Sequence, residues 1–332
     1  MKKIYILIAM FGALVSFSAC NDEWTEELYS QMVSFKAPVG SNGVNNVYIR
    51  YKANGTGTYA LPVIVSGSKM NGKALDVKIS VDNDTLAELN KEKYDYRTDL
   101  YYKQLPENFY QLPAKKCHIP ADSCQALYNL TFNFAGLDMV EKWVLPLTID
   151  KDPSYTLNRR LGWNKALLNI NLFNDYSGSY SATVMNVYLG NDNTPTAATT
   201  RTARVNDENS IFFYAGVVWE EAEDRGKYKI IVKFDDPTTL EDGTKKGNLE
   251  VSAADPDINF SLTGTPYYTI IERMDPKLPY LKYYDVNLYM TYTYYDVTSV
   301  PGHPIKYRAS GSMTMERALN TLIPDQDQAI QW

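Results

Sequence analysis

The sequence predicts an all-β protein in which an N-terminal β-sandwich precedes a C-terminal antiparallel β-barrel or β-sandwich. Three observations support this prediction. Short segments of alternating polar and apolar residues recur between turn signals, and no long segment has a helical period. Tyrosine is unusually frequent, at 27 of 332 residues, and aromatic side chains suit the half-buried surface of a sheet. A chain of this length has room for about two domains.

The N-terminal half consists of short candidate strands separated by turns. Apolar and polar residues alternate through 74–82, which is typical of an antiparallel sheet with one face in water. One short helix is expected at 85–92, with Asp84 or Thr85 as its N-cap. The expected strands are 31–36, 46–52, 59–66, 74–82, 115–119, 125–134, 143–149 and 165–172. Their number and spacing favour a β-sandwich.

The C-terminal half is again rich in strands joined by short connections, which favours a closed barrel or a second sandwich. The expected strands are 179–189, 199–205, 211–219, 227–235, 247–252, 259–263, 267–273, 284–297 and 305–315. The expected domain boundary lies near 173–178, a connection short enough to limit relative motion. The predicted organisation is a signal peptide at 1–19, an acidic tether at 20–33, a first domain at 34–173 and a second at 174–332.

The N-terminus has the layout of a secretory signal. Two lysines precede an apolar run from Ile4 to Val15 that is too short to span a membrane, and Cys20 follows two small residues. This arrangement resembles a bacterial lipoprotein signal, in which the cysteine is acylated; an ordinary signal with a chance cysteine is the alternative. The acidic stretch 21–27 resembles the signal for display on the outer face of the Bacteroidetes outer membrane. It also suits a solvated tether, and both interpretations are compatible.

The composition argues against several kinds of function. The net charge of −6 and the lack of clustered Lys and Arg disfavour nucleic acid as a partner. Two histidines are few for a His-rich metal site or a histidine relay. The sequence therefore indicates no metal and no cofactor.

Cys117 and Cys124 flank a turn signal at Pro120 and Ala121. If these two residues form the centre of a tight hairpin, the cysteines face each other across it at a separation that suits a disulfide. A bridge is therefore a candidate in an oxidising compartment. A metal site with His118 would still lack a fourth ligand.

Several motifs together resemble one family. They are Tyr110-Gln-Leu-Pro-Ala, Ile119-Pro-Ala-Asp, Leu130-Thr-Phe, Leu145-Pro-Leu-Thr-Ile149 and Asn174-Asp-Tyr-Ser-Gly-Ser-Tyr180. They resemble the two-domain surface lipoproteins of Bacteroidetes polysaccharide-utilisation loci. The resemblance implies an Ig-like N-terminal sandwich, also found in front of some endo-glycosidases, and a variable C-terminal domain. It further implies display beside an outer-membrane glycan importer and, for several members, glycan capture. These motifs are structural turns and strands, so the resemblance identifies no binding residue in this chain.

No nucleophile elbow, phosphate loop, zincin helix or dinucleotide motif is present, so an enzyme is not expected. Glycoside hydrolysis would need two suitably spaced carboxylates. The densest acidic cluster, Glu220-Glu221-Ala-Glu-Asp224, follows a predicted strand and precedes Arg225-Gly226. It is expected to be an exposed hairpin loop with solvated charges.

Aromatic residues indicate a function more clearly than the acidic cluster does. Ten tyrosines fall between Tyr267 and Tyr307, and aromatic rings with neighbouring polar groups bind sugars by stacking and hydrogen bonding. In 285–296, alternate residues point to opposite faces of the strand, and the apolar face, which includes Tyr292 and Tyr294, is assigned to the core. This leaves Tyr289 on a polar face, as a stacking platform or a cross-strand partner. The candidate glycan-binding residues are Trp219, Tyr280, Tyr283, Tyr284 and Tyr289.

The sequence therefore predicts a noncatalytic lipoprotein, anchored through Cys20 to the outer membrane and facing the cell exterior. It would capture a poly- or oligosaccharide for an outer-membrane glycan importer within a polysaccharide-utilisation system. The alternative is a structural or adhesive surface component, such as a fimbrillin-like subunit or an importer-docking protein.

Overall fold

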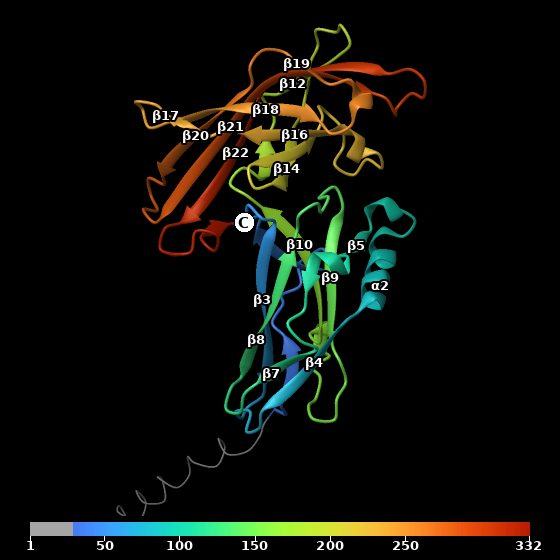
Figure 1. Ribbon diagram of the computed structural model, residues 1–332, viewed down its shortest axis with the longest axis vertical. Coiled ribbons are helices and arrows are strands. Elements are labelled where there is room, and N and C mark those ends of the chain that lie inside the picture. Colours follow the sequence, from blue (N-terminus) through green and yellow to red (C-terminus); the bar gives the residue numbers. More distant parts are fainter. Residues whose placement is uncertain (1–28) are drawn as a thin grey trace, which may run out of the picture.

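The computed structural model describes residues 29–332 and contains two β units, with the C-terminal unit above the N-terminal one in Figure 1. The expected signal peptide, Cys20 and most of the acidic tether lie outside the described residues. The all-β prediction is confirmed, and the C-terminal unit is a closed barrel. No helix within residues 29–332 combines the length and hydropathy needed to cross a membrane.

The N-terminal unit is a sandwich of two sheets. One sheet has the order β1 (Met32–Phe35), β3 (Thr56–Ser66), β8 (Gln125–Asn133) and β6 (Tyr110–Gln111). The other has the order β2 (Asn45–Arg50), β10 (Lys165–Phe173), β9 (Lys142–Ile149), β4 (Leu75–Val81) and β7 (Lys116–Ile119), with β5 (Tyr102–Gln104) beside β9. β2 runs parallel to β10, and the alternating apolar residues of both sheets meet in one buried core.

Helix α2 (Asn83–Tyr94) packs beside the sandwich (Figure 1) and begins earlier than expected. Its N-cap is Asp82, whose carboxylate accepts hydrogen bonds from the Thr85 backbone N–H at 3.2 Å and the Thr85 hydroxyl at 2.7 Å. The prediction of Asp84 or Thr85 as the cap was therefore wrong, because the carboxylate one turn back reaches the free N–H groups of the first turn. The short helices of this unit are η1 (Thr98–Leu100), η2 (Glu107–Phe109) and η3 (Arg160–Gly162).

The C-terminal unit contains eight strands that close on themselves, because the last of them pairs with the first. Their order is β22 (Ile305–Asn320), β11 (Gly178–Ser181), β14 (Thr200–Asp207), β15 (Ser210–Tyr214), β16 (Lys229–Phe234), β18 (Lys245–Ala253), β20 (Tyr267–Met274) and β21 (Leu281–Asp296), which returns to β22. Closure removes the exposed edges that an open sheet would present.

Smaller elements extend the barrel. Beside its strands lie β12 (Asn186–Leu189), β13 (Thr196–Ala197), β17 (Thr238–Thr239), β19 (Ser261–Leu262) and β23 (Ile330–Gln331), and its short helices are η4 (Arg225–Tyr228) and η5 (Pro256–Ile258). Strands β21 and β22 are the longest, at 16 residues each. The parity prediction for β21 is confirmed, since Tyr292 and Tyr294 are 1% exposed inside the barrel core.

The two units contact each other at several points. Arg50 of β2 pairs with Asp175 at 2.7 Å and with Asp327 at 2.6 Å. On another side, Lys229 of β16 pairs with Asp138 at 2.8 Å. Asp175 lies in the short segment between β10 and β11, whereas Asp327 and Lys229 belong to the C-terminal unit, so these contacts tie the sandwich both to the connection and to the barrel unit.

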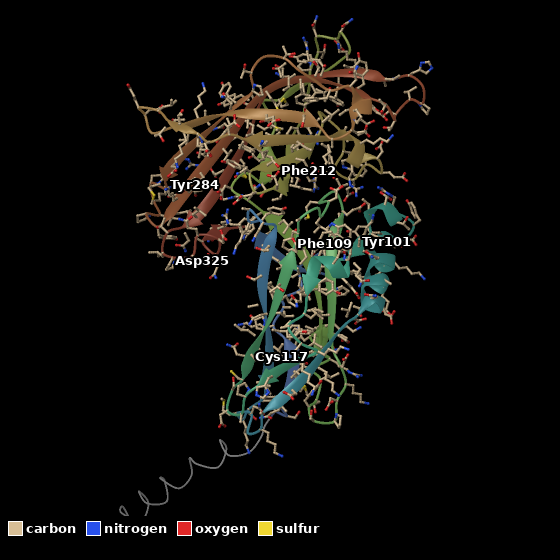
Figure 2. The ribbon with its side chains drawn as sticks, viewed as in Figure 1. Tyr101, Phe109, Cys117, Phe212, Tyr284 and Asp325 are labelled. Atoms are coloured by element: carbon tan, nitrogen blue, oxygen red, sulfur yellow. The ribbon has the colours of Figure 1, made fainter. Side chains whose placement is uncertain are left out.

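The two cysteines do not face each other. Cys117 is buried in β7, which pairs with β4, whereas Cys124 is exposed next to β8, which pairs with β3 and β6. Both thiols are free. The expected disulfide hairpin is therefore wrong: β7 and β8 belong to different sheets, and the residues between them form the crossing from one sheet to the other. Burial raises the pKa of the Cys117 thiol to about 11. Figure 2 shows Cys117 within the sandwich, well away from the barrel.

Candidate functional site

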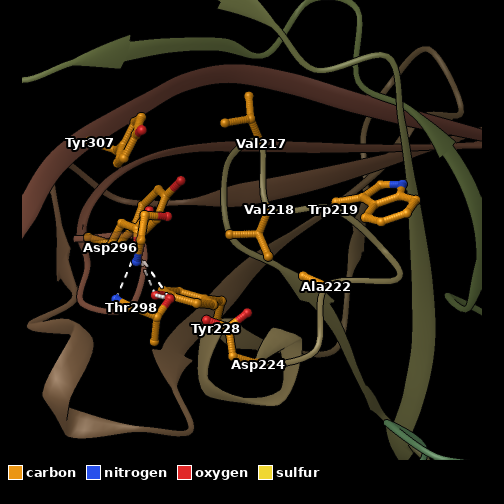
Figure 3. Close-up of a pocket in the computed structure, with 11 residues that line it drawn as sticks. Val217, Val218, Trp219, Ala222, Asp224, Tyr228, Asp296, Thr298 and Tyr307 are labelled. Atoms are coloured by element: carbon orange, nitrogen blue, oxygen red, sulfur yellow. Dashed lines mark hydrogen bonds between the residues drawn. The ribbon is translucent and has the colours of Figure 1, made fainter. Parts of the chain in front are cut away.

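One end of the barrel carries a pocket of about 350 Å³ that combines aromatic rings with polar groups. Its walls come from the connection between β15 and β16 and from the connection between β21 and β22 (Figure 3). The lining residues are Val217, Val218, Trp219, Ala222, Asp224, Tyr228, Tyr294, Asp296, Thr298, Ser299 and Tyr307. Of the residues proposed from sequence, Trp219 belongs to this group.

The polar side of the pocket is built around Asp296, the last residue of β21. Its Oδ1 accepts hydrogen bonds from the Tyr228 hydroxyl at 2.9 Å and from the backbone N–H groups of Thr298 and Ser299 at 3.0 Å each. The Tyr228 hydroxyl also lies 2.5 Å from the Thr298 hydroxyl and accepts the backbone N–H of Val297 at 3.1 Å. These bonds hold the carboxylate in a fixed position.

The same contacts keep Asp296 ionised. Burial alone would raise the pKa of this carboxyl group, but the hydrogen bonds from Ser299, Thr298 and Tyr228 outweigh burial and lower the pKa to about 2. The pocket therefore presents a carboxylate at neutral pH. Asp224 adds a second acidic side chain, and among the described residues that line this pocket there is no Lys, Arg or His.

Aromatic rings form the apolar part of the pocket. Tyr294 and Tyr307 stack with ring centroids 5.3 Å apart and an interplanar angle of 14°. Tyr228 meets Tyr294 edge to face at 6.4 Å. Trp219 is 60% exposed and lies on the opposite side of the pocket from Tyr307 and Asp296 (Figure 3). An exposed ring and a hydrogen-bonded polar cluster thus line opposite sides of one hollow.

Hydrogen bonds from the barrel core hold the loop that carries Trp219. The buried Arg201 of β14 donates to the carbonyl of Val218 at 2.9 Å and to the carbonyl of Gly216. The N–H of Gly216 donates to the Tyr292 hydroxyl at 2.9 Å. Gly216 has a φ of +51°, and a Cβ added there would lie 2.4 Å from the Tyr294 hydroxyl oxygen. The loop therefore holds its shape without a ligand, which limits the entropy lost on binding.

The acidic cluster is less exposed than expected. It does lie in the connection between β15 and β16, but Glu220 is only partly exposed and forms a salt bridge with Arg204 at 2.8 Å. The backbone N–H of Thr202 also donates to Glu220, at 3.2 Å. Glu220 therefore ties the loop to β14, and Asp224 is the member of the cluster that lines the pocket.

The tyrosines proposed from sequence do not gather around Trp219. Tyr280 is 38% exposed at the turn between β20 and β21, and Tyr283 donates to Asp275 at 3.2 Å beneath the Arg273 guanidinium. Tyr284 lines a separate hollow of about 270 Å³ at the other end of the barrel (Figure 2). Tyr289 lies on the outer face of the barrel and stacks on its cross-strand partner Tyr267 at 4.5 Å.

Sequence reasoning missed Asp296, Thr298 and Ser299. A usable signal was present: an aspartate followed by Val-Thr-Ser at a strand end is a typical capping and turn pattern, in which the carboxylate collects nearby N–H groups. It could not show that Tyr228 and Trp219, on another hairpin, meet this turn. Within residues 29–332 no group of three or more His, Cys, Asp or Glu side chains is arranged to hold a metal ion.

The fold and the pocket together define a class of two-domain protein with a β-sandwich followed by a closed eight-stranded barrel. A model of a domain of unknown function, DUF4973, matches residues 24–153, and a model of a C-terminal domain matches residues 164–314. No functionally characterised, curated protein matches the chain.

Solved structures from Bacteroides resemble the whole chain. A multidomain protein including DUF1735 from Bacteroides ovatus is 45% identical, with a TM-score of 0.79 and coverage of 90% of this chain and 99% of that one. A B. ovatus protein of unknown function is also 45% identical, with a TM-score of 0.81 and coverage of 91% and 100%. An auxiliary nutrient binding protein from Bacteroides thetaiotaomicron is 34% identical, with a TM-score of 0.78 and coverage of 88% and 97%. The chain belongs to this family of two-domain Bacteroides proteins.

Proposed function

We propose that this protein is a noncatalytic, cell-surface saccharide-binding protein that captures glycan for an outer-membrane polysaccharide-utilisation system. The observation that carries the proposal is the barrel-end pocket, whose lining includes both the exposed Trp219 ring and the fixed Asp296 carboxylate. The relative from B. thetaiotaomicron, described as an auxiliary nutrient binding protein, supports a nutrient-binding role. In this proposal the protein is attached to a lipid at Cys20, faces the cell exterior and delivers its glycan to an outer-membrane importer.

The pocket suits the chemistry of a sugar. A pyranose presents an apolar C–H face, which packs on an aromatic ring such as Trp219, and hydroxyl groups around its edge. The hydroxyl groups of Thr298 and Ser299 and the carboxylates of Asp224 and Asp296 line the same hollow. A carboxylate accepts strong hydrogen bonds from sugar hydroxyls. Both requirements for orienting a sugar are therefore met within one pocket.

The charge of the pocket selects among glycans. Asp224 and Asp296 supply negative charge, and the described lining residues include no cation to offset it. A uronic acid or sulfated sugar would place like charges close together in a partly desolvated site, which is unfavourable. The ligand class is therefore neutral glycan.

The electrostatics of the carboxyl groups favour binding over hydrolysis. Glycoside hydrolysis needs one carboxyl group with a raised pKa to protonate the leaving group. Within residues 29–332, each Asp or Glu whose pKa is displaced has a lowered pKa, and Asp296, with a pKa of about 2, is ionised. An ionised carboxylate can orient a hydroxyl group but cannot act as the acid.

The test is calorimetry and affinity electrophoresis of the full-length protein against neutral and acidic polysaccharides. Trp219→Ala should weaken binding of a neutral polysaccharide about tenfold, because an exposed aromatic anchor typically contributes at least ~1.4 kcal/mol. Trp163→Ala, which removes a 39% exposed tryptophan on the sandwich, is the matched control and should bind normally.

Unchanged affinity in Trp219→Ala would remove the pocket from the proposal, and preference for an acidic polysaccharide would overturn the ligand class. Release of reducing sugar by the wild-type protein would show an enzyme instead. Pull-down of a surface polymer without saccharide binding would favour a structural or adhesive role.

The proposed anchor has a separate test. Metabolic labelling with a palmitate analogue should mark the wild-type protein and not Cys20→Ala. External protease should degrade the wild-type protein on intact cells. Labelling that persists in Cys20→Ala would contradict lipid attachment at this residue.

A further inference from the structure

A second aromatic feature lies where the sandwich meets the barrel. Tyr48 of β2 and Trp332, which follows β23, stack with ring centroids 4.2 Å apart and an interplanar angle of 12°. Tyr48 is 43% exposed and Trp332 is 56% exposed. One ring comes from the sandwich and the other from the segment beside β22, so the pair exists only when both units are in place.

Groups from both units pack against the Trp332 ring of the aromatic pair. The Phe173 ring meets Trp332 edge to face at 5.0 Å, and the Arg317 guanidinium lies 6.0 Å from the centre of the Trp332 ring. Arg317 is buried and donates to the carbonyls of Asn174 at 2.9 Å and Ser177 at 2.5 Å. The junction is thus packed by buried groups, whereas the Tyr48 and Trp332 rings keep large exposed surfaces.

A row of asparagine side chains leads along the sheet to this pair. In the parallel register of β2 and β10, Asn169 lies opposite Asn46, and Asn171 lies opposite Tyr48. The Nδ2 of Asn169 donates to Asn46 Oδ1 at 2.9 Å, and the Nδ2 of Asn171 donates to the Asn169 carbonyl at 3.1 Å. Within residues 29–332 the Oδ1 atoms of Asn169 and Asn171 accept no hydrogen bond from the protein. They are available to a ligand.

Tyr48, Trp332, Asn169 and Asn171 line a groove of about 430 Å³ between the two units. Asn42, Asn169, Asn171, Tyr48 and Trp332 form one wall, and Ser177, Ser179 and Thr202 lie on the barrel side. Of the three charged residues that line the groove, Arg204 pairs with Glu220 at 2.8 Å and Glu141 pairs with Lys103 at 2.7 Å. The third, Lys142, forms no salt bridge within residues 29–332, and its ammonium group lies 5.2 Å from the centre of the Tyr94 ring. The groove therefore offers amides, hydroxyl groups and aromatic rings, together with one cationic side chain at Lys142.

We propose that this groove is a second saccharide-binding site, in which a neutral oligosaccharide lies along the asparagine row and packs a sugar ring against Tyr48 and Trp332. The saccharide class rests on the proposed function, whereas the location of the site does not. Two sites on one chain would raise the apparent affinity for a long polymer, because binding at one site holds the polymer near the other.

The experiment is calorimetric titration of the full-length protein with maltoheptaose, cellohexaose and mannohexaose, and polygalacturonate as the anionic comparison. Wild type should bind two molecules of a neutral oligosaccharide. Tyr48→Ala and Asn171→Ala should each reduce the number bound to one, or weaken the second event at least tenfold. Tyr96→Ala, which removes an 83% exposed tyrosine, is the control and should bind two. Melting temperatures identify any variant that fails to fold.

Combination with Trp219→Ala separates the two proposals. Residual binding in Trp219→Ala that disappears in Trp219→Ala/Tyr48→Ala supports the junction site. Complete loss of binding in Trp219→Ala alone, or two molecules bound by both Tyr48→Ala and Asn171→Ala, overturns the junction site and leaves the barrel-end pocket standing. Binding that depends on Tyr48 but not on Trp219 overturns the pocket alone. A wild-type protein that binds none of the oligosaccharides overturns both.

Discussion

Asp296 shows how a single residue acquires its properties from its neighbours. Asp296 is the last residue of β21. Its Oδ1 accepts hydrogen bonds from the N–H groups of the following turn and from the Tyr228 hydroxyl. These donors lower the pKa to about 2 although burial opposes ionisation. The same carboxylate therefore stabilises the folded barrel and supplies an acceptor in the pocket.

This low pKa predicts a pH dependence of stability. A carboxyl group with a depressed folded-state pKa stabilises the protein above its unfolded-state pKa of ~4, and that stabilisation is lost as the pH falls toward the folded-state value. The difference in melting temperature between wild type and Asp296→Asn should thus shrink between about pH 4 and pH 2. Thermal melts across this range measure it. Glu241→Gln, an exposed loop change, is the control, and a constant difference for Asp296→Asn would contradict the prediction.

The cysteines predict a difference in reactivity. The thiolate is the reactive form, and burial raises the pKa of the Cys117 thiol to about 11, whereas Cys124 is exposed. In native protein at pH 8, Cys124→Ser should remove one thiol that reacts rapidly with a disulfide reagent. Cys117→Ser should change the count only after denaturation. Equal rates for the two thiols in the native protein would contradict the buried position of Cys117.

At the scale of elements, β21 was the most predictable part of the barrel. Its alternation assigned Val286, Leu288, Met290, Tyr292 and Tyr294 to one face, and all five are buried. Alternation predicts a face because side chains of a strand point in turn to opposite sides. It could not say whether Tyr289, on the other face, serves a ligand or the sheet. The structure shows it stacked on Tyr267.

The loop that carries Trp219 depends on Gly216. Its positive φ costs about 1–2 kcal/mol for any residue with a Cβ, and here the added carbon would also meet the Tyr294 hydroxyl oxygen at 2.4 Å. Gly216→Ala should lower the free energy of unfolding by more than this cost and weaken saccharide binding. Urea unfolding and calorimetry measure both effects.

Gly243→Ala is the matched control for the Gly216 prediction. Gly243 has a φ of +84°, but nothing lies within 4 Å of the added Cβ. This variant should therefore lower the free energy of unfolding only by the cost of the positive φ, and it should bind saccharide as wild type does. Equal destabilisation by both changes would show that the Tyr294 contact has no role in positioning the loop.

For the whole molecule, we expect the contacts at the junction to make the sandwich and the barrel unfold together. Arg50 joins β2 to Asp175 and Asp327, and its guanidinium lies 5.0 Å from the centre of the Phe173 ring. The short segment between β10 and β11 brings the units close, but these side chains hold them in one orientation. The proposed junction groove exists only in that orientation.

Arg50→Met should uncouple the two units. It keeps most of the side-chain volume but removes both ion pairs. We therefore expect one thermal transition for wild type and two resolved transitions for the variant. Differential scanning calorimetry measures this. Lys52→Met, an exposed change on the same side of the junction that breaks no ion pair within the described residues, should leave a single transition. A single unshifted transition for Arg50→Met would show that the pairs do not couple the units.

Much of the fold could be predicted because its signals are local. Alternation located strands such as 227–235, and turn residues separated them, since both patterns depend on neighbours in the chain. The disulfide prediction failed for the same reason. Symmetry about Pro120 suggested a hairpin, but the strands on either side belong to different sheets, and pairing between distant strands is not encoded in a local pattern.

By itself, the sequence determined the all-β class, the core face of β21 and the aromatic character of the C-terminal unit. Only the tertiary structure decided that the unit closes into a barrel and which groups share a site. Closure of the barrel by the pairing of β22 with β11 brings the turn after Asp296 beside the loop of Trp219, and docking of the sandwich brings Tyr48 onto Trp332. The residues that line each candidate site are far apart in the chain. They come together only when the strands between them pair, so no local sequence pattern could predict which of them meet.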